Sequence, residues 1–227
     1  MITIGHIFYG QHKMLPLHEA AWKRHGEDSV LYTMIDDASP IPLPLSFGKK
    51  NLSIYRVEQD IPWNIAGARN LVFHTAKTEW VFCADVDHVV TPEALSAIMA
   101  LDRSDPNIVY TFRRRARDGY VGVDAIINVL MNRARFFEMG GYDEDYSGHY
   151  GREETFFLRC LKHHNISIVR CDDIYLDWHP KFGGTWKLNR DKTFNGAIFE
   201  KKIEDLQAGR YTNPPILRFD WHLLETA

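Results

Sequence analysis

One stretch of the sequence constrains the fold more than any other: a short apolar run that ends in two aspartates. Residues Trp80–Ala84 carry no polar side chain, and Asp85 and Asp87 follow directly. An apolar run without alternation is typical of a central strand that is covered on both faces. The stretch therefore predicts a buried strand in an α/β protein, with two carboxylates at the carboxyl end of that strand.

The two aspartates form a candidate metal site. In extended backbone, residues at positions i and i+2 point to the same side, so both carboxylates would enter one small volume. Like charges that close are costly unless a cation lies between them, and carboxylate oxygens suit Mg²⁺ or Mn²⁺. We interpret Asp85 and Asp87 as ligands of such an ion, which would hold a phosphorylated substrate at the ligand-binding edge of the sheet. Alternatively, Asp87 is a solvated turn residue before a helix that Thr91 caps and Pro92 opens.

Strand and helix patterns alternate along most of the chain. Strand–helix–strand order predicts parallel pairing with right-handed crossovers. The 227 residues contain no internal repeat or low-complexity linker, so we predict a single α/β domain with a mostly parallel central sheet flanked by helices. Besides the central run, the expected strands are 2–8, 29–35, 52–57, 108–112, 126–131 and 166–169, and the expected helices are 17–25, 65–77, 92–101, 134–139, 155–164 and 200–207, with a long irregular segment from residue 176.

Composition and charge exclude several classes of protein. The net charge of −3 gives no basis for a general nucleic-acid binder. The three cysteines are scattered and odd in number, which is typical of reduced thiols in a cytosolic protein. No window has the length of a membrane span, and the N-terminus has the pattern of a first strand. We therefore expect a soluble, cytoplasmic protein without a transmembrane segment.

Other polar and aromatic positions have two interpretations each. Asp36 and Asp37 follow the second predicted strand and either form a turn before Pro40 or accept hydrogen bonds from a base or ribose. The basic run 113–117 either guards a sheet edge or faces an acceptor or a phosphate. Three tryptophans, Trp63, Trp178 and Trp186, are predicted core residues, although Trp178 or Trp186 could instead stack on an acceptor sugar. The polar, glycine-containing segments 142–150 and 181–195 are candidate mobile lids.

Five short motifs occur in an order that resembles a known family. They are Asp-Asp-x-Ser at 36–39, Ala-Arg-Asn at 68–70, Asp-x-Asp at 85–87, Gly-Gly-Tyr-Asp-Glu at 140–144 and Gly-x-Glu-Glu at 151–154, with His179 further on. Each motif is loose, but five in this order are much more specific. From about Ile2 to His179 the chain resembles the GT-A glycosyltransferases, closest to the inverting family 2 type and the related galactosyltransferase/chondroitin-synthase type.

The resemblance implies a donor site in the first half of the chain, residues 1–112. There the nucleotide base of a nucleotide-diphospho-sugar, a UDP-sugar, would contact Asp36 or Asp37, and Arg69 would lie near the donor. By the same resemblance, Asp85 and Asp87 would hold Mn²⁺ or Mg²⁺ against the diphosphate.

The second half, residues 113–227, would bind a carbohydrate or glycoconjugate acceptor and carry out catalysis. The resemblance gives the last acid of Gly-x-Glu-Glu, Glu154, as the base that deprotonates an acceptor hydroxyl, with Glu153 as the alternative. By itself the pair is also explained by the preference for acids in a first helical turn. His179 would supply a further metal ligand, although a histidine between Trp and Pro is also typical of a packed, hydrogen-bonded side chain.

Two other functions remain open from the sequence. A sugar nucleotidyltransferase of similar architecture would need a glycine-rich loop with basic residues near the N-terminus, and residues 5–13 contain two glycines and one lysine. A non-catalytic module that binds a nucleotide sugar would keep the fold without a working base.

Overall fold

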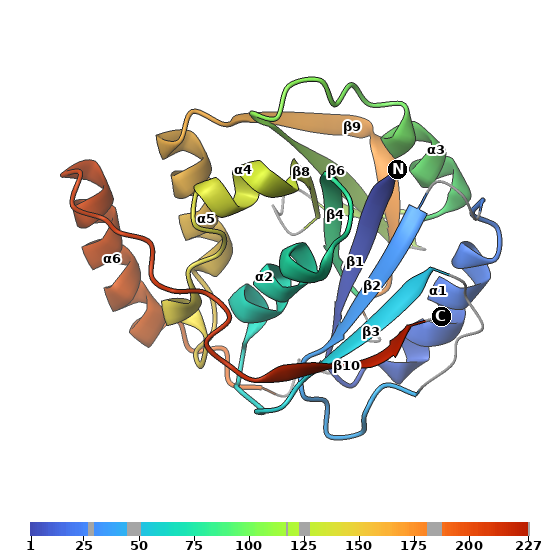
Figure 1. Cartoon of the computed structure of the whole chain (residues 1–227), viewed down its shortest axis with the longest axis horizontal. Helices are drawn as coiled ribbons and strands as arrows, with labels where there is room; N and C mark the ends of the chain where they lie inside the picture. Colours follow the sequence, from blue (N-terminus) through green and yellow to red (C-terminus); the bar gives the residue numbers. More distant parts are fainter. Residues whose placement is uncertain (27–29, 45–50, 117, 123–127, 181–187, 227) are drawn as a thin grey trace.

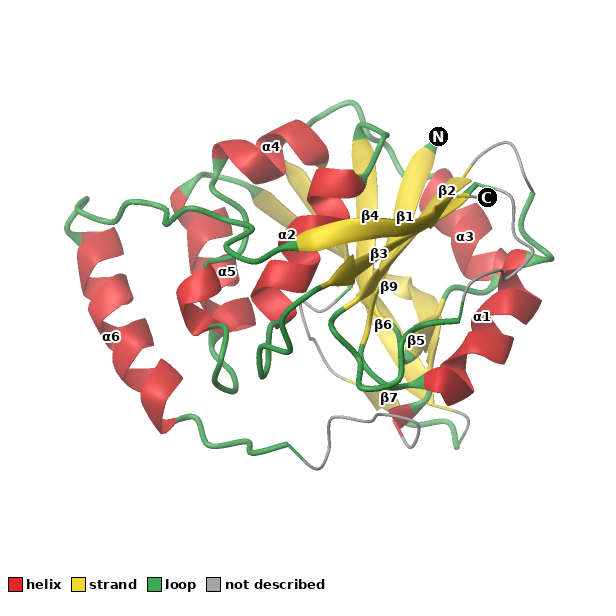
Figure 2. Cartoon of the chain, turned by 60° about the horizontal axis from the view of Figure 1, so that its bottom comes forward, coloured by secondary structure: helices red, strands yellow, loops and turns green. Residues whose placement is uncertain are grey.

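Ten strands of the described residues form one mixed sheet with helices on both faces (Figures 1 and 2). The computed structural model describes residues 1–26, 30–44, 51–116, 118–122, 128–180 and 188–226. The strand order is β10-β3-β2-β1-β4-β8-β6-β9-β5, with β7 paired to β6. The predicted central strand, β4, therefore lies in the middle of the sheet.

The strands and helices have the following bounds. The strands are β1 (Ile2–Phe8), β2 (Val30–Asp36), β3 (Leu52–Val57), β4 (Trp80–Asp85), β5 (His88–Val89), β6 (Ile108–Ala116), β7 (Val121–Gly122), β8 (Val129–Asn132), β9 (Ser167–Trp178) and β10 (Trp221–Thr226). The α-helices are α1 (Leu15–Trp22), α2 (Ile65–Thr75), α3 (Pro92–Met99), α4 (Arg133–Glu138), α5 (Glu153–His163) and α6 (Thr193–Gln207), and short 3₁₀ helices cover His12–Met14 and Glu144–Tyr146.

Parallel pairing is confined to two parts of the sheet. The run β3-β2-β1-β4 is parallel, as the predicted crossovers require, and β6 is parallel to β9. Strand β8 lies antiparallel between β4 and β6, and β10 closes one edge antiparallel to β3. Because β1, β2 and β4 are parallel, their carboxyl ends meet at one edge.

Each face of the sheet has its own apolar core. Helices α1 and α3 cover the face that carries Ile4 and Phe8 of β1, and α2, α4 and α5 cover the opposite face, with α6 packed on the outer side of α5 (Figure 2). A Cβ atom on Gly5 would lie 2.1 Å from Cγ1 of Val72. Helix α2 can therefore pack directly on β1 only because residue 5 has no side chain.

Several predicted elements differ from those in the structure. Strand β9 is far longer than the expected 166–169. Its last three residues, Leu176–Trp178, belong to the sheet, whereas an irregular segment was expected from residue 176. Its exposed, polar residues hide the strand pattern, and β6 supplies the hydrogen-bond partners that sequence alone does not show. Helix α6 begins at Thr193 rather than at residue 200, and β10 was not expected. Residues 126 and 127 of one expected strand lie outside the described residues, as does Trp186.

The segment 142–150 does not have the exposure expected of a mobile lid. Tyr142, Glu144 and Tyr146 are buried, and Asn70 donates to both the Tyr142 carbonyl and the Glu144 carboxylate. Hydrogen bonds and ring packing therefore anchor this segment to α2. Of the second expected lid, residues 181–187 lie outside the described part and 193–195 belong to α6. Within the part that the structure describes, no helix has the length and apolar composition needed to cross a membrane.

Candidate active site

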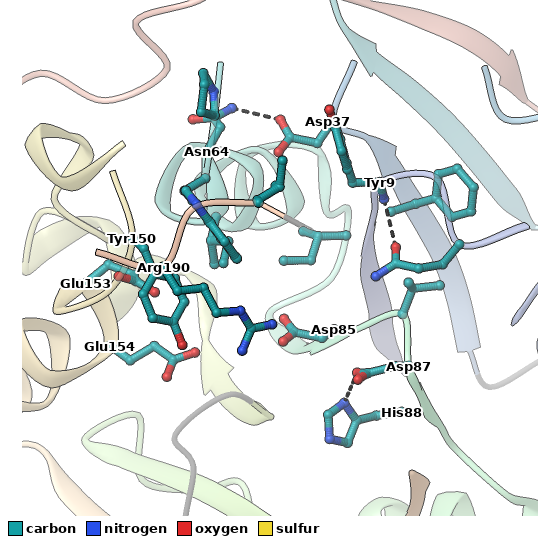
Figure 3. A pocket seen from close by; sticks show the side chains of 18 of the residues that line it. Tyr9, Asp37, Asn64, Asp85, Asp87, His88, Tyr150, Glu153, Glu154 and Arg190 are labelled. Carbon is teal, nitrogen blue, oxygen red and sulfur yellow. Dashed lines mark hydrogen bonds and ion pairs between the residues drawn. The ribbon is translucent and has the colours of Figure 1, made fainter. Parts of the chain in front are cut away.

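A pocket of about 610 Å³ opens where the parallel strands end (Figure 3). Its lining includes Phe8 at the end of β1, Asp37 just after β2 and Asp85 at the end of β4. Glu153 and Glu154 enter from the first turn of α5, on the other half of the chain. The strand ends and the helix start, far apart in sequence, therefore share one cavity.

Arg69 joins the two halves of this pocket. The side chain lies on α2 and is fully buried. Its Nη2 nitrogen donates to Oδ1 of Asp85 at 2.9 Å and to Oε1 of Glu154 at 2.9 Å. One guanidinium therefore fixes the end of β4 relative to the start of α5.

The pocket concentrates negative charge. Burial raises the pKa of Asp85, Arg69 opposes this rise, and Asp87 and Glu154 add smaller increases. Burial, and then the neighbouring Glu154, raise the pKa of Glu153 to about 7. Burial and the neighbouring carboxylates therefore disfavour the charged forms of Asp85 and Glu153 despite Arg69, which is the electrostatic setting that a bound cation relieves.

Asp87 is held by the opposite side of the pocket. Its Oδ2 accepts a hydrogen bond from Nε1 of Trp178 at 3.1 Å, and its Oδ1 lies 2.7 Å from Nδ1 of His88 (Figure 3). The Oδ1 contact lacks hydrogen-bond geometry, so this buried oxygen has no hydrogen-bond partner. Burial alone would raise the pKa of Asp87, but His88, Trp178 and Arg114 lower it and prevail.

Asp85 and Asp87 fit a hard divalent cation. Both carboxylates line the pocket, they share an excess of negative charge, and one buried Asp87 oxygen has no hydrogen-bond donor. Mg²⁺ typically takes one or two protein carboxylates and completes its shell with water and substrate phosphates. Among the described residues, no three His, Cys, Asp or Glu side chains are grouped as a complete metal site.

His179 lies next to this pair but does not line the pocket. Its backbone N–H donates to the Asp87 carbonyl at 2.8 Å, beyond the end of β9. Its half-buried imidazole is close enough to His18 to lower the pKa of that residue, whose main perturbation is burial. The His179 backbone therefore lies beside Asp87, and the His179 side chain lies near the buried His18.

Asp36 and Asp37 take different positions. The Asp36 carboxylate is buried and accepts hydrogen bonds from the Ser39 and Leu43 amides and from Arg56. Asp37 lines the pocket and accepts a hydrogen bond from Nδ2 of Asn64 at 2.8 Å (Figure 3). Burial raises the pKa of Asp37 to about 8, although the Asn64 hydrogen bond opposes the shift. Asp36 therefore has the turn-forming contacts, and Asp37 is the one that a ligand in the pocket can reach.

One wall of the pocket is formed by aromatic and basic residues that the sequence interpretation did not bring together. Trp63 is half-buried in the pocket wall rather than in the core, with φ at +53°, an unusual conformation for a bulky residue. Its Nε1 donates to the Asn189 carbonyl at 2.7 Å, and Arg190 lies over its ring and over that of Tyr150 (Figure 3). The sequence feature that could have indicated this wall is Trp63 itself, a large aromatic residue in the loop directly after Pro62. Trp178, for which the sequence left a core position and stacking on an acceptor sugar as alternatives, is half-buried and lines the pocket.

The family model described as glycosyl transferase family 2 matches residues 35–164, more than half of the chain. The chain belongs to glycosyl transferase family 2. The matched segment runs from the end of β2 through α5 and includes Asp37, Arg69, Asp85 and Glu154. The segment that matches the family model therefore contains many of the residues that form the pocket. No curated protein sequence matches the chain.

Solved structures share the fold at low sequence identity, and the chain has the GT-A fold that was predicted. TarS 1-349 of S. aureus in complex with UDP-GlcNAc is 15% identical, with a TM-score of 0.62 over 78% of this chain and 58% of that one. The mannosyltransferase PcManGT of Pyrobaculum calidifontis, in complex with GDP-Man and Mn²⁺, is 14% identical, with a TM-score of 0.62 over 94% and 65%. The catalytic domain of Drosophila beta1,4galactosyltransferase 7, in complex with xylobiose, is 16% identical, with a TM-score of 0.57 over 88% and 79%. The chain spans less than two thirds of the length of the first two.

Proposed function

We propose that this protein is a metal-dependent inverting glycosyltransferase. In this proposal it moves a sugar from a nucleotide-diphospho-sugar, a UDP-sugar, to a hydroxyl group of a carbohydrate acceptor. The observation that carries the proposal is the contact of one buried cation, Arg69, with both Asp85 and Glu154. This contact supports the proposal because it holds Asp85, which would bind the metal, and Glu154, which would act as the base, close to one another.

The donor would enter from the side of β1 and β2. Phe8, Tyr9 and Asp37 line that side, so a base or ribose could stack and hydrogen-bond there. The diphosphate would then reach Asp85 and Asp87 at the end of β4. A bound Mn²⁺ or Mg²⁺ would neutralise the charge that develops on the departing diphosphate. The complexes of other GT-A proteins with UDP-GlcNAc, or with GDP-Man and Mn²⁺, support this assignment.

Glu154 would act on the acceptor. An inverting transfer needs a carboxylate that removes the proton from the acceptor hydroxyl while that oxygen attacks the sugar carbon from the face opposite the diphosphate. Arg69 holds the Glu154 carboxylate, and Glu154 lies in the first turn of α5, where a helix stabilises negative charge. Glu153, one residue earlier, lines the same pocket and is the alternative base.

A donor-binding experiment tests the proposal. We expect Mn²⁺ together with the correct nucleotide sugar to raise the thermal unfolding midpoint, because a ligand that binds the folded form stabilises it. A panel of UDP- and GDP-sugars with and without Mn²⁺ would identify the donor, and UDP or GDP release would report turnover.

The matched variants are Asp87→Asn in the pocket and Asp102→Asn in a loop after α3, where the carboxylate accepts a local hydrogen bond from Ser104. We expect Asp87→Asn to lose the Mn²⁺-dependent shift and turnover, and Asp102→Asn to keep both. Full turnover in Asp87→Asn, or in the wild-type protein with EDTA, would contradict the proposal.

A further inference from the structure

Three consecutive arginines on β6, residues 113–115, differ in where their side chains lie: only the middle one of the three lines the pocket. Arg113 pairs with Asp172, and the guanidinium of Arg115 lies over the ring of Tyr175. Arg114 lies between them in sequence and lines the pocket. Successive side chains of a strand point to opposite faces, so the alternation of β6 selects Arg114 alone for this wall.

The position of Arg114 is built into the surrounding strands. Its guanidinium lies 4.2 Å from the centroid of the Trp178 ring, on β9. On the other side, β7 pairs Gly122 with Arg114, and a Cβ atom on Gly122 would lie 2.4 Å from the Arg114 Nε. An aromatic shelf and a position without a side chain therefore form a groove that fits this arginine.

Arg114 forms no ion pair or hydrogen bond with a carboxylate among the described residues, although it is near enough to Asp87 to lower the pKa of that carboxyl. Its Nε is buried without a hydrogen-bond acceptor, and none of the ion pairs within the described ranges includes it. The nearby Asp87 carboxylate is already in contact with His88 and Trp178. A guanidinium that lines a pocket with unused donors is a recognition group for an anion.

The strand order separates Arg114 from the nucleotide side. Asp37 follows β2, which lies two strands from β4 in one direction, and Arg114 is on β6, which lies two strands from β4 in the other. The proposed donor diphosphate lies at β4, between them. A ligand group that reaches Arg114 would therefore lie on the side of Asp87 away from the nucleotide base, toward the two reacting sugars.

We propose that Arg114 binds a negatively charged group, a carboxylate or a phosphate ester, on one of the two sugars that react. The inference rests on the proposed function and adds the substrate class: an anionic sugar, supplied either by the donor or by the acceptor. The Trp178 ring supports the guanidinium from one side, and Tyr120, whose ring is 6.0 Å from that of Trp178, extends the same wall to the surface.

Equilibrium binding with paired neutral and anionic ligands tests the inference. Calorimetry with Mn²⁺ would compare UDP-glucose with UDP-glucuronate for the donor, and methyl glucoside with methyl glucuronide and glucose 6-phosphate for the acceptor. We expect the wild-type protein to bind the anionic member of one pair more tightly, and Arg114→Gln to reduce that preference roughly tenfold or more, as expected for a hydrogen bond to a charged group.

Two further variants make the test specific. Gly122→Ala keeps the charge of Arg114 but fills its groove, so we expect it to reduce the same preference. Arg115→Gln removes an equal charge from the opposite face of β6, and we expect the preference to remain. The pair that shows the preference identifies the source of the charge.

Three results would overturn the inference. They are equal binding of neutral and anionic ligands by the wild-type protein, an unchanged preference in Arg114→Gln, or an equal loss in Arg115→Gln. Weaker binding of UDP itself by Arg114→Gln would assign the arginine to the diphosphate and also overturn it. Failure of the proposed function is a different result, in which no nucleotide sugar binds the wild-type protein with Mn²⁺.

Discussion

The Nη2 nitrogen of Arg69 lies 2.9 Å from Oε1 of Glu154, a residue 85 positions further along the chain. The same nitrogen contacts Asp85, so the end of a strand and the start of a helix have a fixed separation. Asp85 and Glu154 are the residues that we propose for metal binding and for proton removal. Their relative position therefore depends on a side chain that need not touch either substrate.

Removing Arg69 should destabilise the protein. Arg69→Met would leave Asp85 and Glu154 without their shared cation, and we expect a loss of about 3 kcal/mol in the free energy of unfolding, since breaking a buried pair leaves an uncompensated charge. Chemical denaturation measures this loss. Arg24→Met is the control, because the Arg24–Glu93 pair is exposed on both sides, and we expect a change of less than about 1 kcal/mol there. Equal losses in the two variants would mean that the Arg69 contacts add little to stability.

The two glutamates of α5 should differ in their effect on catalysis. If Glu154 is the base, Glu154→Gln should lower kcat by about 10²–10⁴-fold while donor affinity changes little, because the amide cannot accept the proton. Glu153→Gln should lower kcat less. Steady-state kinetics with calorimetric donor binding would separate the two effects. The reverse order of the two variants would assign the base to Glu153.

Glu153 should make stability depend on pH. Its pKa is about 7 in the folded protein and close to 4.5 when unfolded, so the folded state holds the extra proton between these values. The stability that this proton supplies is complete below pH 4.5 and is lost as the pH rises through 7, with a total of up to about 3 kcal/mol. Denaturation of wild-type protein and Glu153→Gln between pH 5 and 8 measures the difference. We expect the wild type to lose stability relative to the variant as the pH rises, and parallel curves would contradict the pKa shift.

Gly5 should tolerate no side chain. A Cβ atom there would lie 2.1 Å from Val72 Cγ1, so Gly5→Ala must push α2 away from β1. We expect a loss of about 1–3 kcal/mol, as for other overpacked cores. Gly26→Ala is the control, because the added Cβ has no atom of the described residues within 4 Å, its chain neighbours aside. Thermal unfolding compares the two, and an unchanged midpoint in Gly5→Ala would show that α2 can shift at little cost.

The parts of the fold that the sequence predicted are those where a residue pattern and burial agree. Strands β1 and β3 have the predicted bounds, and β4 differs by one residue. In these strands the pattern of apolar residues indicates which faces of the strand are buried. Strand β10 and most of the length of β9 were not predicted, because both strands lie toward the edges of the sheet and carry many exposed residues. Their hydrogen-bond partners are on β6 and β3, and no local pattern contains that information.

The sequence by itself determined an α/β protein of a recognisable family and the strand ends where acidic residues collect, since alternation, apolar runs and short motifs are local. Only the tertiary structure decided which acidic side chains face the pocket, as the contrast between Asp36 and Asp37 shows. It also decided that Arg69 joins Asp85 to Glu154 and that Arg114, rather than Arg113 or Arg115, lines the pocket. The physical reason is that strand pairing and helix packing set these distances, and both depend on contacts between residues far apart in the chain.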